Sequence, residues 1–61
     1  MWIFTNGRGS HNTEQIRKIE VIGTGTYVSY DNGVPVCISV APVENVIRDA
    51  IRRGDNYVEV E

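Results

Sequence analysis

The 61-residue sequence predicts a small α+β domain in which one amphipathic helix packs on one face of an antiparallel sheet of four to five strands. Three observations support this fold class. Apolar residues alternate over 34–40, as in a half-buried strand. Asn32-Gly33 stands between two runs rich in β-formers, which indicates a hairpin. Apolar residues recur with helical spacing over 43–51. We therefore expect one domain over residues 1–61, with the order ββββα and a fifth strand after the helix.

The first strand is predicted over residues 1–5. Trp2, Ile3 and Phe4 are consecutive, so this strand would carry large apolar side chains on both faces, with Trp2 and Phe4 sharing one of them. The polar, Gly-rich stretch 6–12 then predicts a loop.

A single helical turn and two more strands are predicted next. Asn12 is a favourable N-cap, and Gln15 three residues later completes a capping-box pattern. Residues 16–22 alternate with a period of two and predict the second strand. The turn at 23–25 leads to a third strand over 26–30, which is rich in Thr, Tyr and Val.

The fourth strand, over 34–40, has two chemically different faces. One face carries Val34, Val36, Ile38 and Val40, whereas the other carries Pro35, Cys37, Ser39 and Ala41. The helix is predicted to begin at Pro42, a residue favoured in the first turn, and to end before Gly54, a favoured C-terminal cap. Its apolar stripe, which we expect to cover the first face, consists of Val43, Val46, Ile47, Ala50 and Ile51. Alternation over 56–60 is consistent with the fifth strand.

The second face of the sheet predicts a protein interface. One helix covers only one face, so the other face of a monomer should be polar. Here that face is predicted to hold large aromatic and small uncharged side chains, and exposed apolar patches mark contact surfaces. The last strand adds an edge that can pair with another chain. The predicted interface residues are Trp2, Phe4, Cys37, Ser39, Tyr57 and Val58. Coverage of this face by loops and chain ends is the simpler alternative.

Composition narrows the class of protein. With 41% hydrophobic and 23% charged residues, the chain is typical of a soluble globular protein, and no apolar run approaches the length of a membrane span. The apolar start lacks the charged region of a signal peptide. The net charge of −2 disfavours a general nucleic-acid binder. One Cys and one His exclude an internal disulfide and a Cys- or His-rich metal cluster. We expect a cytoplasmic protein without a cofactor.

The sequence predicts no enzyme. Ser10 and His11 are adjacent, and adjacent side chains rarely meet as nucleophile and base. Cys37 has no basic neighbour on its strand face that would activate its thiol. The expectation is instead a non-enzymatic interaction or regulatory module. It would act as a homo-oligomer or dock on a larger protein, for example as an inhibitor.

Two alternative functions arise from other parts of the chain. The segment Gly7, Arg8, Gly9 and Ser10 suits a phosphate or similar anion, because Gly-rich backbone N–H groups and a guanidinium bind phosphate. A surface turn needs the same glycines, and the P-loop spacing is absent. This segment predicts a small nucleotide-binding or sequestering protein. Aromatic residues in the sheet suggest RNA stacking as the other alternative, which the shortage of basic residues disfavours.

The order of the motifs resembles that of small flagellar-operon FlbD-like proteins. These have an opening Ile/Thr strand, an Asn before an Ile-Glu strand, an Asn-Gly hairpin and a Val-Glu-x-Val-Ile helix. The corresponding residues here are Ile3 and Thr5, Asn12, Ile19-Glu20, Asn32-Gly33 and 43–47. The resemblance covers about residues 1–51 and implies a small bacterial or phage ββββα protein.

The N-terminal part also resembles the carbon storage regulator (CsrA) family. The similarity lies in residues 1–5, Gly9 and 21–23. That family's Asn-Ala-Pro segment and the Arg after it, which contacts RNA, have no equivalent in this chain. This second resemblance therefore does not imply RNA binding.

Overall fold

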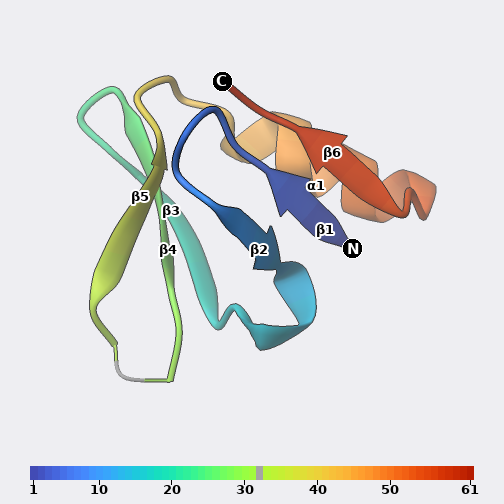
Figure 1. Ribbon diagram of the computed structural model, residues 1–61, viewed down its shortest axis with the longest axis horizontal. Coiled ribbons are helices and arrows are strands. Elements are labelled where there is room, and N and C mark those ends of the chain that lie inside the picture. Colours follow the sequence, from blue (N-terminus) through green and yellow to red (C-terminus); the bar gives the residue numbers. More distant parts are fainter. Residues whose placement is uncertain (32) are drawn as a thin grey trace.

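Two three-stranded sheets and one α-helix form the fold in the computed structural model, which describes residues 1–31 and 33–61 (Figure 1). The first sheet has the strand order β2-β1-β6 and the second has the order β3-β4-β5. The elements are β1 (Trp2–Phe4), β2 (Ser10–Asn12), the 3-10 turn η1 (Thr13–Gln15), β3 (Lys18–Ile22), β4 (Gly25–Ser29), β5 (Pro35–Ser39), α1 (Glu44–Arg53) and β6 (Tyr57–Glu59). The predicted α+β class is confirmed. The prediction of a single antiparallel sheet with four to five strands is wrong.

The first sheet joins the two ends of the chain. β1 pairs antiparallel with β2 and parallel with β6, so that Ile3 lies between His11 and Val58. The sequence predicts a loop where β2 lies, because Ser10–Asn12 is short and polar and shows no apolar alternation. Only the pairing with β1 makes this segment a strand. The parallel β1–β6 pair likewise depends on residues far apart in the sequence, so no local pattern indicates it.

The turn that follows β2 is confirmed. Asn12 is the N-cap of η1, and its side-chain oxygen accepts a hydrogen bond of 3.0 Å from the backbone N–H of Glu14. After this turn, the Arg17 N–H donates to the Ser29 carbonyl over 2.8 Å, which leads the chain into the second sheet.

The second sheet consists of the predicted hairpins. β4 pairs antiparallel with both β3 and β5. Gly23 in the first turn has a φ of 64°, a conformation that glycine adopts without strain. In the second turn, the predicted Asn-Gly pair includes Asn32, which lies outside the described residues. Gly33 beside it has a φ of 76°, and its N–H donates to the Tyr30 carbonyl.

An irregularity in β5 changes which of its residues are buried. The register of β5 against β4 slips next to Thr26, so that Ile38 has no partner on β4. As a result, Ile38 and Ser39 are both fully buried although they are consecutive. Simple alternation places Val36 and Val40 on the covered face with Ile38, but both of these valines are exposed.

Buried hydroxyl groups hold the connection between β5 and α1. Thr26 Oγ1 accepts the N–H of Val43 and donates to the carbonyl of Ala41, both over 2.8 Å. Ser39 Oγ accepts the Ala41 N–H over 3.1 Å. The helix begins two residues after Pro42, its predicted start. Thr26 therefore satisfies a backbone N–H at the start of α1 that a capping side chain would otherwise satisfy.

The end of α1 is the predicted glycine cap. Gly54 has a φ of 76°, and its N–H donates to the Ile51 carbonyl over 3.0 Å. The Asp55 N–H donates to the Ala50 carbonyl over 3.0 Å. These two bonds form a Schellman motif, which turns the chain back toward β6.

The hydrophobic core lies between the sheets and the helix. α1 packs mainly against β3 and β6 (Figure 1). Residues of both sheets, of α1 and of the segment after β6 form the buried cluster, which consists of Ile3, Val28, Ile38, Ile47 and Val60. In the apolar stripe of α1, Ile47 and Ala50 are buried, whereas Val46 and Ile51 remain exposed. The core is small, as expected for a chain of this length.

Candidate functional site

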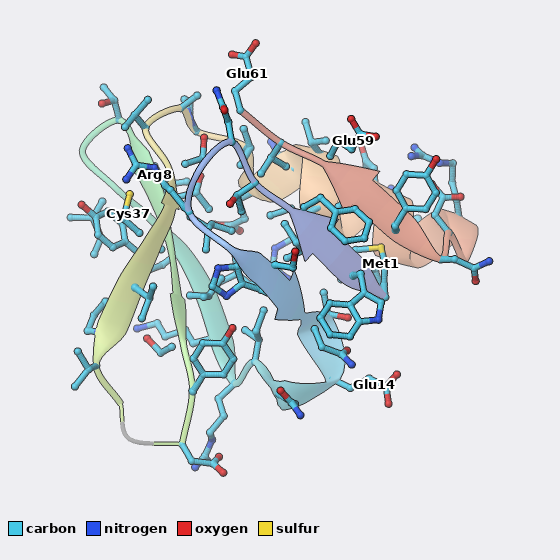
Figure 2. All side chains as sticks on the ribbon, viewed as in Figure 1. Met1, Arg8, Glu14, Cys37, Glu59 and Glu61 are labelled. Atoms are coloured by element: carbon cyan, nitrogen blue, oxygen red, sulfur yellow. The ribbon has the colours of Figure 1, made fainter. Side chains whose placement is uncertain are left out.

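Three exposed aromatic side chains share the outer face of the first sheet, opposite the side on which α1 lies (Figure 1). The exposed fractions of Trp2, Phe4 and Tyr57 are 45%, 41% and 56%. Trp2 lies opposite Tyr57 in the β1–β6 register, and the ring centroids of Phe4 and Tyr57 are 5.7 Å apart. In Figure 2, ring side chains lie over β1 and β6 on the side facing the viewer. We call Trp2, Phe4 and Tyr57 the aromatic face.

Strand alternation produces this arrangement. Successive side chains of a strand point to opposite faces, and paired residues of neighbouring strands share a face. Ile3 and Val58 are paired and point inward, so Trp2, Phe4 and Tyr57 point outward. The prediction that Trp2 and Phe4 share a face is confirmed. The structure adds Tyr57 to them and places the half-buried side chain of Val58 on the inner face.

Two of the predicted interface residues lie elsewhere. Cys37 lies in β5 of the second sheet and is half-buried. Its thiol donates a hydrogen bond to the Ser39 carbonyl oxygen over 3.3 Å. Ser39 is fully buried because of the register slip in β5. The prediction that Cys37 and Ser39 share one face with Trp2 and Phe4 is therefore wrong, because β1 and β5 belong to different sheets.

The Gly-rich segment forms a turn closed by its own hydrogen bonds. Thr5 Oγ1 accepts the Arg8 N–H over 2.9 Å and donates to the Gly9 carbonyl over 2.6 Å. Gly7 and Gly9 have φ values of 79° and 83°, which other residues rarely adopt. Ser10 already belongs to β2. The predicted anion site thus has one of its backbone donors occupied by Thr5, while the glycines supply the turn geometry.

A polar contact that sequence reasoning missed connects the two sheets. His11 Nδ1 in β2 lies 2.5 Å from the Tyr30 hydroxyl oxygen just after β4, and His11 Nε2 lies 2.9 Å from the Arg8 carbonyl oxygen. A carbonyl can only accept, so Nε2 carries the proton and, in the neutral ring, Nδ1 accepts from the Tyr30 hydroxyl. Burial raises the pKa of the Tyr30 phenol above its ordinary value, which keeps the hydroxyl protonated as that donor. The two rings also stack, with centroids 6.1 Å apart.

These hydrogen bonds give the His11 side chain a structural role. Both ring nitrogens are engaged, and the neighbouring Ser10 is exposed on the opposite side of β2. His11 and Tyr30 are 19 residues apart, and no sequence motif joins them. Only the packing of the two sheets brings them together.

Neither a metal-binding cluster nor a membrane-spanning helix is found in the part of the chain that the structure describes. No group of three or more His, Cys, Asp or Glu side chains in residues 1–31 and 33–61 is placed to hold a metal ion. No helix in these residues has the length and apolar character needed to cross a bilayer. Compared with protein-family models, curated proteins and solved structures, the chain gives no match.

Proposed function

We propose that the protein is a non-enzymatic interaction module that associates with a second copy of itself through the aromatic face. The observation that carries this proposal is the grouping of Trp2, Phe4 and Tyr57 on the uncovered side of the first sheet. Trp and Tyr are enriched at the centres of protein interfaces, because they bury large areas and lose little rotamer freedom.

The small core supports self-association. Six hydrophobic residues are buried among the described residues, and a chain of this size gains only a few kcal/mol from such a core. A standard interface buries about 800 Å² on each partner. That is a substantial part of the 4019 Å² accessible surface of this chain. Burial of the aromatic face would therefore stabilise the fold as well as the assembly.

The biological role that we propose is regulatory. A small assembly with two equivalent surfaces is suited to dock on a larger bacterial or phage protein as a regulator or inhibitor. Three features support a binding role over catalysis. Both ring nitrogens of His11 are engaged in structural hydrogen bonds, Cys37 is half-buried and directed at a carbonyl, and the Arg8 amide closes its own turn.

The experiment is light scattering after size-exclusion chromatography of the wild type and two variants. Trp2→Glu places a charge on the aromatic face. Ile22→Glu places the same charge on an equally exposed apolar residue of the second sheet, where the exposed fraction is 49% against 45% for Trp2. We expect a multiple of the 6.8 kDa chain mass for the wild type and for Ile22→Glu, and a folded monomer for Trp2→Glu. A monomeric wild type at millimolar concentration contradicts the proposal.

A further inference from the structure

The outer edge of β6 is an open strand edge. β6 is the last strand in the order β2-β1-β6, and no described element lies beyond it (Figure 1). The Trp2 N–H donates to the Asn56 carbonyl over 3.0 Å, and the Val60 N–H donates to the Phe4 carbonyl over 2.9 Å. Asn56 and Val60 therefore face β1. Since the backbone groups of successive strand residues point to opposite edges, those of Tyr57 and Glu59 point to the open edge.

A groove runs along this edge. It has a volume of about 480 Å³ and is lined by Arg53, Asp55, Asn56, Tyr57, Val58 and Glu59. Tyr57, whose ring belongs to the aromatic face, is one of these lining residues. The groove therefore offers free backbone N–H and C=O groups beside an aromatic ring, which is the arrangement that an added strand requires.

Two of the three acidic side chains that make no ion pair among the described residues lie in β6 or just after it. Within the described residues, five ion pairs engage every basic side chain except Arg8. The acidic side chains outside these pairs are Glu14, Glu59 and Glu61. Figure 2 shows Glu59 and Glu61 extending outward near the C-terminal end of the chain. Arg53, the base in the groove, is already paired with Asp55 over 2.9 Å.

We propose that the β6 edge binds an extended basic segment of a partner protein by strand addition. The inference rests on the proposed role of the protein as an interaction module and names the class of partner. Tyr57 and Glu59 would exchange backbone hydrogen bonds with the added strand. Lysine or arginine side chains would lie opposite Glu59, and apolar side chains at the alternating positions would continue the inner face from Val58.

The negative charge at the β6 edge favours a basic segment over a second copy of the chain. Two copies that paired through β6 would bring their unpaired acidic residues, Glu59 and Glu61 of each chain, onto one seam. Like charges placed opposite each other across a strand pair are destabilising. A basic segment experiences attraction at the same positions. Association through the aromatic face leaves this edge open, because the face and the edge of a sheet point in different directions.

The probe is a blocked peptide with the sequence Lys-Val-Lys-Val-Lys-Val-Lys, titrated into isotope-labelled protein at low salt and followed by NMR. We expect the amide signals of Tyr57 and Glu59 to move most. Glu59→Gln should weaken binding about three-fold, as for an exposed ion pair. Glu14→Gln removes an equally unpaired charge away from the groove and should leave the affinity unchanged.

Backbone pairing is tested separately from charge. Glu59→Pro removes the carboxylate and also an N–H that points to the open edge, a change that edge strands tolerate. It should weaken binding by about ten-fold or more, against about three-fold for Glu59→Gln, and the difference between the two variants reports the backbone bond. A peptide methylated on alternate backbone nitrogens tests the same bonds without altering the protein, and it should also fail to bind. The proposal is overturned if the wild type does not bind the basic peptide, if Glu14→Gln weakens binding as much as Glu59→Gln, or if the methylated peptide binds as well as the unmodified one.

The two proposals fail in different ways. Failure of self-association appears as a monomeric wild type whose β6 edge still binds the peptide. If strand addition fails, the wild type still assembles and Trp2→Glu still dissociates the assembly, but the peptide does not bind.

Discussion

The rings of Phe4 and Tyr57 lie with their centroids 5.7 Å apart and their planes inclined at 49°, although the two residues come from opposite ends of the chain. Their strands are parallel neighbours, which leaves both side chains on the outer face of the first sheet. This contact links the closure of the sheet to the proposed binding surface. Changes in either residue should therefore affect both stability and association.

A double-mutant cycle measures the Phe4–Tyr57 contact. Phe4→Leu, Tyr57→Leu and the double variant keep apolar side chains at both positions. We expect a coupling free energy of about 0.5 kcal/mol, at the lower end for aromatic pairs because both rings are partly exposed. Urea denaturation at low protein concentration measures it. Additive effects of the two single substitutions would show that the rings do not interact.

Tyr30 should make stability depend on alkaline pH. Burial raises the pKa of its phenol in the folded state. The resulting stabilisation is complete below the unfolded pKa of about 10 and is lost as the pH rises through the higher folded value. Ionisation also removes the O–H that is donated to His11. The wild type should therefore lose more stability between about pH 9 and pH 11 than Tyr30→Phe does.

Chemical denaturation of both proteins at the two pH values tests this prediction. The two proteins differ only at residue 30, so the difference between their losses of stability isolates Tyr30. Equal losses of stability in wild type and Tyr30→Phe would contradict the role of the partly buried Tyr30 hydroxyl.

Thr26 should be among the most sensitive polar positions. Its hydroxyl satisfies the Ala41 carbonyl and the Val43 N–H in a fully buried environment. Thr26→Val keeps the shape but leaves both backbone groups without this partner, so we expect a loss of about 2 kcal/mol or more. Thr26→Ser retains the hydroxyl and should cost about 1 kcal/mol for the lost methyl group. A Thr26→Val protein that unfolds at the same urea concentration as Thr26→Ser would contradict this assignment.

Gly54 should tolerate asparagine better than alanine. Its φ of 76° lies in the left-handed region, where a Cβ atom is disfavoured. Gly54→Ala should lower the free energy of unfolding by about 1 kcal/mol. Gly54→Asn should cost less, because asparagine visits this region more readily. Thermal unfolding followed by circular dichroism distinguishes the two variants, and the opposite order would show that the glycine cap is not what ends α1.

Local patterns predict most of the elements but not how they combine. The apolar stripe, the glycine after it and the two hairpins each leave a signal within about a dozen residues of sequence, and all three appear in the structure. The division into two sheets leaves no such signal. It depends on the polar β2 segment and on a parallel pair between the chain ends, where long-range pairing overrides local propensity.

The candidate site was predictable to the same extent. Alternation alone places Trp2 and Phe4 on one face, because a strand has a period of two whichever sheet it joins. The partners of these residues depend on topology. Tyr57 joins them because β6 pairs with β1, and Cys37 and Ser39 are excluded because β5 belongs to the second sheet. The register of β5 also slips by one residue, which buries Ser39. A one-residue slip moves side chains between faces, and nothing in residues 34–40 marks its position.

Trp2 fluorescence tests the central claim most directly, since Trp2 is the only tryptophan in the chain and lies on the aromatic face. Emission spectra would be recorded over a dilution series from millimolar to nanomolar protein, with the mass measured in parallel. If the aromatic face is the contact surface, the emission maximum shifts to longer wavelength on dilution, with the same midpoint as the change in mass. An emission maximum that stays constant while the mass changes would place the contact elsewhere and contradict the account.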